Sequence, residues 1–184
     1  MSLALQVIDH NVNQTTELIH EKMQIWIHYE LFTWRWWLGV FFSIVPWAVW
    51  YVLTRRNSMR DRLLFVGFMV SLIAVALDVL GDQYGLWHYR FNVVPIIPTY
   101  FPWDLTLMPI TVMFFLQITP NANPLLKSVV FALASSLIGE PVFYWMDIYN
   151  PIHWKFAYSI PIQIAIFLIA YYFCKTRSKF APYE

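Results

Sequence analysis

Two acidic residues stand inside long apolar segments, where an ionised carboxylate is costly. Asp78 and Glu140 each lie fifteen residues after the first residue of an apolar run, in residues 63–80 and 125–146. A carboxyl group at this depth in hydrocarbon must be protonated, paired or exposed to water, and it is therefore a candidate functional group. Two carboxyl groups in one low-dielectric site can share a proton, which gives a general acid.

Structural ion pairing is the alternative interpretation of these acids. Asp104, at the start of another apolar segment, is the third candidate acid. Arg35, Arg90 and Lys155 are the bases that could neutralise the acids. Buried ion pairs of this kind need no catalysis.

The composition is that of a membrane protein. Aromatic residues make up 20% of the 184 residues and charged residues only 12%, too little charge for the surface of a soluble domain. The ten Trp and eleven Tyr suit the interfacial belts of membrane proteins. The net charge of +1 gives a nucleic-acid partner no electrostatic support. The five His are scattered, so we expect neither a metal nor a cofactor.

Five apolar segments predict an all-α bundle of five transmembrane helices. They cover residues 34–53, 63–80, 103–118, 125–146 and 154–174. About 20 apolar residues cross a bilayer. The third segment is the shortest and contains Pro109, so a re-entrant or broken helix is the alternative there.

A polar N-terminal segment, residues 1–32, precedes the predicted membrane domain, residues 33–184. Residues 13–31 have the pattern of an amphipathic helix on the lipid headgroups, with Thr15 or Thr16 as its cap. We expect residues 1–12 to be frayed. The segment has no basic region before an apolar one, so we expect no cleavable signal peptide.

Lys and Arg residues predict the orientation of the bundle. Eight lie in the first and third loops and at the C-terminus, and four lie on the other side of the membrane. Because basic residues accumulate in the cytoplasm, we expect the N-terminus outside a bacterial cytoplasmic membrane and the C-terminus inside. The second and fourth helices then end outside, which places Asp78 and Glu140 in the outer half.

This orientation predicts an acidic pocket in the outer half of the bundle, rimmed by aromatic residues of the long loop 81–102. Besides the three acids, the candidate pocket residues are Arg35, Asp82, Trp87, His88, Tyr89, Arg90, Tyr144, Lys155 and Gln163. Gln163 belongs to a helical stripe with Ser159, Ala170 and Cys174, which close helix packing also explains. The loop could equally be an aromatic anchor at the interface.

Four motifs span nearly the whole chain. They are Trp36-Trp37 with Pro46-Trp47, Gly85-Leu86-Trp87-His88-Tyr89, Glu140-Pro141, and Trp154-Lys155 with Tyr158-Ser159-Ile160-Pro161. In these motifs the chain resembles an uncharacterised family of small membrane proteins from spore-forming Firmicutes. The resemblance implies a five-span membrane protein and carries no established activity.

A second, shorter pattern joins an acid, an aromatic run and a further acid. It consists of Asp78 or Asp82, then residues 85–89, then Pro102-Trp103-Asp104. It resembles the lycopene-cyclase-like membrane terpene cyclases, although the paired-glutamate motif of that family is missing. The resemblance implies an acid that protonates a polyprenyl chain and aromatic rings that stabilise carbocations.

The sequence leaves two main functions open. The first is a non-enzymatic membrane protein that binds a lipid or a protein partner in envelope or spore physiology. The second is an acid-catalysed enzyme acting on an isoprenoid or lipid, with Asp78, Asp104 and Glu140 as acid and base. A transporter or proton-linked channel would need more polar residues in the inner half, where Gln117 and Gln163 are the main ones.

Overall fold

The computed structural model describes residues 2–118 and 120–176, and most of them are helical. The helices are α1 (Leu3–Ile25), α2 (Trp34–Thr54), α3 (Arg60–Gln83), α4 (Met108–Gln117), α5 (Pro124–Ala134), α6 (Glu140–Trp145) and α7 (Phe156–Thr176). Three π-helical turns, η1 (Trp26–Glu30), η2 (Trp103–Leu107) and η3 (Ser135–Gly139), extend α1, precede α4 and join α5 to α6. Strands β1 (Trp87–Tyr89) and β2 (Tyr149–Pro151) pair antiparallel.

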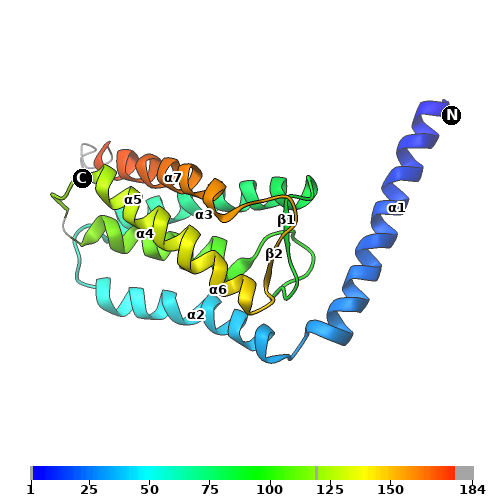
Figure 1. Ribbon diagram of the computed structural model, residues 1–184, viewed down its shortest axis with the longest axis horizontal. Helices are drawn as coiled ribbons and strands as arrows, with labels where there is room; N and C mark the ends of the chain where they lie inside the picture. The colour runs from blue at the N-terminus through cyan, green and yellow to red at the C-terminus, as the bar shows by residue number, and fades with distance from the viewer. Residues whose placement is uncertain (1, 119, 177–184) are drawn as a thin grey trace, which may run out of the picture.

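Helices α2 to α7 form a bundle, and α1 projects away from it (Figure 1). The paired strands cover the end of the bundle where α3 ends and α7 begins (Figure 1). In their register His88 faces Asn150 and Tyr89 faces Tyr149. The strands were not predicted, because neither three-residue segment alternates long enough to indicate a strand.

Within the described residues, four helices are long and apolar enough to cross a membrane. They are Trp34–Thr54, Arg60–Gln83, Pro124–Trp145 and Phe156–Thr176, and they match four of the five predicted segments. The remaining segment forms a shorter apolar helix, Trp103–Gln117. A mostly helical bundle with apolar helices of membrane-spanning length is therefore confirmed.

The N-terminal helix begins earlier than its amphipathic pattern predicts. It starts at Leu3, with Ser2 as its N-cap, so the expected fraying is wrong for residues 3–12, and residue 1 lies outside the described residues. Thr15 and Thr16 are not caps. Their hydroxyls donate to carbonyls four residues earlier, at Asn11 and Val12, each at 3.0 Å. These bonds let both threonines lie inside a helix.

Two prolines account for the π-helical turns in the bundle. Pro109 and Pro141 follow η2 and η3, and each lacks the N–H that would bond the carbonyl four residues earlier. For Pro109 that carbonyl belongs to Leu105, and it accepts the indole N–H of Trp47 in α2 at 2.9 Å. The proline thus creates a hydrogen bond between two helices.

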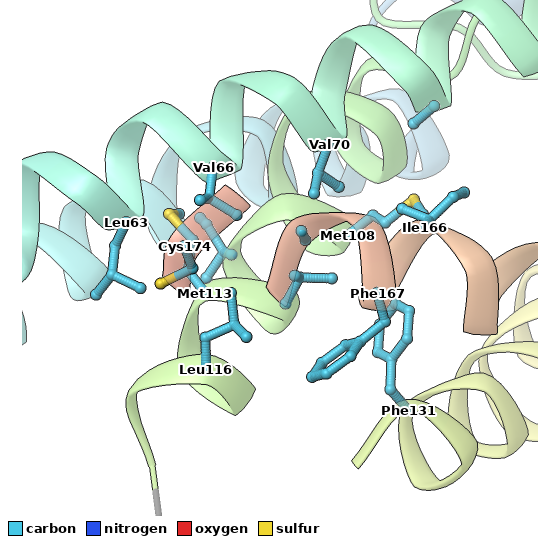
Figure 2. Packing of buried hydrophobic residues seen from close by; sticks show 14 of the residues in the cluster. Leu63, Val66, Val70, Met108, Met113, Leu116, Phe131, Ile166, Phe167 and Cys174 are labelled. Carbon is cyan, nitrogen blue, oxygen red and sulfur yellow. The ribbon is translucent and has the colours of Figure 1, made fainter. Parts of the chain in front are cut away.

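A cluster of apolar side chains fills the part of the bundle away from the strands. Figure 2 shows side chains of α3, α4, α5 and α7 packed together, among them Val66, Met113, Phe131 and Phe167. The rings of Phe131 and Phe167 lie 5.8 Å apart. This cluster forms the floor on which the candidate site rests.

Candidate ligand-binding site

A cavity of about 90 Å³ lies between the apolar cluster and the paired strands. It exceeds several-fold the roughly 10–15 Å³ that one water molecule needs. Its lining comes from α3, η2, α6 and α7, from both strands and from the loops beside them. The lining residues are Ala74, Leu77, Asp78, Trp87, Tyr89, Tyr100, Trp103, Asp104, Met108, Glu140, Phe143, Tyr149, Trp154, Ser159, Ile162, Gln163 and Ile166.

Asp78, in the last turns of α3, is the most fully bonded of the three acids. One carboxylate oxygen accepts the indole N–H of Trp87 at 3.0 Å and the hydroxyl of Tyr89 at 3.4 Å. The other accepts the backbone N–H of Tyr100 at 3.4 Å. Trp87 packs directly on Gly81, one turn further along α3, where a Cβ atom would lie 2.1 Å from the ring. The missing side chain of Gly81 is therefore what admits the indole.

Asp104 faces Asp78 from the π-helical turn η2. Its carboxyl group accepts the hydroxyl of Thr99 and is hydrogen-bonded to the carboxyl group of Asp78. A hydrogen bond between two carboxyl groups requires a proton on one of them. Both side chains are buried, with 7% of Asp78 and 1% of Asp104 exposed. Two carboxyl groups buried this close together can share one proton.

Glu140 is held separately, at the start of α6. It is hydrogen-bonded to Ser159 of α7, whose hydroxyl in turn accepts the indole N–H of Trp154 at 2.9 Å. The Ser159 hydroxyl is therefore the donor to Glu140. The Oε2 atom of Glu140 is buried and has no partner. One oxygen of this carboxyl group is thus fixed, and the other is unused.

Two further buried oxygens at the cavity have no hydrogen-bond partner. They are Oε1 of Gln163, whose side chain is 6% exposed, and the hydroxyl of Tyr100, which is fully buried. Burial raises the pKa of the Tyr100 and Tyr89 phenols above the usual value, so both keep their protons at neutral pH. Buried polar atoms are nearly always bonded, so three orphaned oxygens at one cavity indicate a place for a bound group.

Aromatic rings form a continuous wall around the acids. The ring of Tyr89 stacks on that of Tyr100, with 4.9 Å between the ring centroids. It also contacts the ring of Tyr149 across the strand pair, with 5.4 Å between the centroids. Phe143 packs edge-on against both Tyr100 and Trp103, at 5.7 and 5.9 Å. Such rings present negative faces that favour a positive group.

Six of the predicted site residues line this cavity. They are Asp78, Asp104, Glu140, Trp87, Tyr89 and Gln163. The structure thus brings the three acids together with two aromatic residues of the long loop and one residue of the α7 stripe.

Arg35 does not line the cavity and does not neutralise an acid there. Its guanidinium pairs with Asp147 at 2.8 Å, and its Nε donates to the Met146 carbonyl at 2.6 Å. It also lies over the rings of Trp34 and Phe91, 4.8 Å from each centroid. This is the one ion pair that joins two residues within 2–118 and 120–176. The ion-pairing interpretation of the three acids is therefore not supported by these contacts.

The other predicted pocket residues also lie outside the cavity. His88 lies on β1 between Trp87 and Tyr89, which line the cavity, and it does not line the cavity itself. Its Nε2 lies 3.5 Å from the side-chain amide nitrogen of Asn150. Asp82 and Arg90 flank the lining segments, and neither contributes to the wall. Tyr144 is 45% exposed, and Lys155 lies over the Tyr158 ring at 6.0 Å. The position of these residues relative to the apolar segments predicts the end of the bundle at which they lie, the end that carries the strands. It does not predict the direction in which each side chain points.

Sequence reasoning missed several wall residues. Tyr149, Phe143 and Trp154 are not among the predicted site residues, and Tyr100 is covered only by the general expectation for the aromatic residues of the loop 81–102. Ser159 carried a usable signal, because it lies one turn before Gln163 on the same stripe. The position of Tyr149 depends on the pairing of two distant segments, for which the sequence holds no local signal.

Within residues 2–118 and 120–176 no group of three or more His, Cys, Asp or Glu side chains is arranged to hold a metal ion. Comparisons of the chain with protein-family models, with curated proteins and with solved structures found no match.

Proposed function

We propose that this protein spans a bacterial cytoplasmic membrane five times, with its N-terminus outside and its C-terminus in the cytoplasm. Helix Trp103–Gln117 supplies the fifth crossing, and α1 lies on the headgroups. The outer faces of the bundle support contact with lipid tails, since large apolar side chains such as Phe41, Phe68, Leu126 and Ile138 are exposed there. The excess of Lys and Arg on one side supports the orientation.

The function best supported by the site is binding the polar end of a lipid or another membrane-soluble ligand, in envelope or spore physiology. The observation that carries this proposal is the set of unpartnered oxygens of Glu140, Gln163 and Tyr100 at one cavity. A ligand that donates hydrogen bonds would complete all three. The apolar part of such a ligand would extend from the cavity into the surrounding lipid.

Acid catalysis on an isoprenoid or lipid is the second candidate. The shared proton of Asp78 and Asp104 supports it, because this proton lies beside aromatic rings that stabilise positive charge. The resemblance to membrane terpene cyclases points the same way. In this case the cavity would hold the reacting end of the substrate.

Mass spectrometry of lipids that co-purify with the protein from its native membrane tests both candidates. The variants are Gln163→Leu, which removes an unpartnered oxygen, and Asp104→Asn, which removes a member of the acid pair. Gln117→Leu is the matched control, because Gln117 also has a buried, unpartnered Oε1 but lies outside the cavity.

A ligand-binding protein should retain one specific lipid in the wild type and the control and lose it in Gln163→Leu. An enzyme should accumulate its substrate in Asp104→Asn above the wild-type level. The same bulk phospholipid in all four samples would refute both candidates.

A further inference from the structure

We infer that the polar end of the ligand is a primary ammonium group, an inference that rests on the proposed binding function. The charge of the cavity is the first argument. Among the described residues its lining holds three acids, Asp78, Asp104 and Glu140, of which the first two can share one proton, and it holds neither Lys nor Arg. Arg35 and Lys155 are engaged outside it. Arg90, which follows Tyr89 in the chain, is exposed and does not line the cavity. A positive group would therefore be attracted, and an anionic headgroup repelled.

Hydrogen-bonding capacity is the second argument. In the ionised carboxylate Glu140 Oε2 is an acceptor, Gln163 Oε1 is an acceptor, and the Tyr100 hydroxyl oxygen can also accept. The indole donors of Trp87 and Trp154 and the Tyr89 hydroxyl are already used on Asp78 and Ser159, which leaves the Tyr100 hydroxyl as the one group here that can either donate or accept. An –NH3+ group carries three donors and no acceptor, and it matches this set. A quaternary ammonium has the same charge but no donor, so it would leave the three oxygens unpaired.

The aromatic wall is the third argument. Seven aromatic residues of the described part of the chain line the cavity, and Tyr100, on which Tyr89 stacks, is fully buried. Their ring faces attract a cation that has left water. The volume of about 90 Å³ admits a group of a few non-hydrogen atoms. The site therefore has the size and chemistry for an ammonium headgroup and excludes a whole lipid.

An aminolipid headgroup and a free alkylamine would present the same ammonium, so the test has two arms. In detergent, binding of n-butylammonium is measured by calorimetry at neutral pH, with n-butanol as the uncharged comparison. In nanodiscs, phosphatidylethanolamine is compared with phosphatidylcholine by native mass spectrometry, because methylation keeps the charge and removes the donors. Both arms use the full chain, with Gln163→Leu, Glu140→Gln and the control Gln117→Leu.

We expect the ammonium probe to bind at least about tenfold more tightly than its uncharged or methylated counterpart, as for hydrogen bonds between charged groups. Gln163→Leu and Glu140→Gln should each lower this affinity about tenfold, and Gln117→Leu should not. Binding in the detergent arm alone would identify a free amine, and binding in the nanodisc arm alone an aminolipid.

Equal binding of charged and uncharged probes, or affinities unchanged in both cavity variants, would overturn the ammonium assignment. A specific co-purifying lipid without an amino group would also overturn it, while leaving the binding function in place. Failure of the proposed function is a separate result, in which no specific lipid co-purifies and no probe binds.

Discussion

Replacement of Gly81 by alanine should damage the candidate site through Trp87, without touching any polar group. The new Cβ would lie 2.1 Å from Cζ2 and 2.3 Å from Cε2 of the indole, so the ring must move. Overpacking of this kind costs about 1–3 kcal/mol. Loss of the Trp87–Asp78 hydrogen bond adds about 1.5–3 kcal/mol, and the better helix propensity of alanine returns about 1 kcal/mol. The expected net destabilisation is roughly 1.5–5 kcal/mol.

Gly67→Ala in the same helix is the matched control. Its Cβ would meet the thioether of Met113 at 2.7 Å, the far end of a flexible side chain that can turn away. Thermal unfolding in detergent, followed by circular dichroism, should therefore give a much lower Tm for Gly81→Ala than for Gly67→Ala. Equal Tm values would refute the reasoning. Adding Gly81→Ala to the Trp87→Leu variant should lower Tm only slightly, because the indole ring that would clash with the new Cβ is absent.

Three further predictions concern contacts outside the cavity. Asp147→Asn should change stability by less than about 1 kcal/mol, because that carboxylate is 63% exposed, whereas Arg35→Ala should lower Tm clearly through its lost carbonyl and ring contacts. Burial lowers the pKa of His88, so its stabilising contribution is present above about pH 6.5 and lost on acidification; Tm should fall between pH 7.5 and 5 and fall less in His88→Gln. Glu30 accepts a backbone N–H of the 90–93 loop at 2.8 Å, so Glu30→Ala should speed proteolysis between α1 and α2. A Tm that does not change with pH would contradict the role of partly buried His88. An unchanged cleavage rate in Glu30→Ala would contradict the role of the Glu30 hydrogen bond.

The acids and the α7 stripe could be predicted because their signals are local. Depth within an apolar run identifies Asp78 and Glu140, and spacing along one helix groups Ser159 with Gln163. The structure buries both stripe residues, at 8% and 6% exposure, and they line the cavity beside Glu140.

The aromatic wall and the partners of the acids could not be predicted because they depend on direction and on distant pairing. Arg35 lies at the expected end of α2, but its side chain turns toward the loop at Asp147. Tyr149 reaches the cavity only because β2 pairs with β1. The apolar segments of the sequence predict how far along the bundle axis a residue lies. They predict which helix faces pack together only when both helices carry a clear polar or small-residue stripe.

The hydrogen bond from Trp47 to the Leu105 carbonyl has a consequence for how the bundle selects its arrangement. In the membrane placement proposed above no water competes for a freed carbonyl, so an indole on the neighbouring helix is a specific partner for it. Pro109 and Trp47 therefore act together. Pro109 leaves one free carbonyl acceptor at a single position along its helix, and Trp47 supplies the matching donor from α2. Sliding either helix by one turn would leave both groups unbonded, so the pair fixes the register of α2 against α4 as apolar packing alone would not.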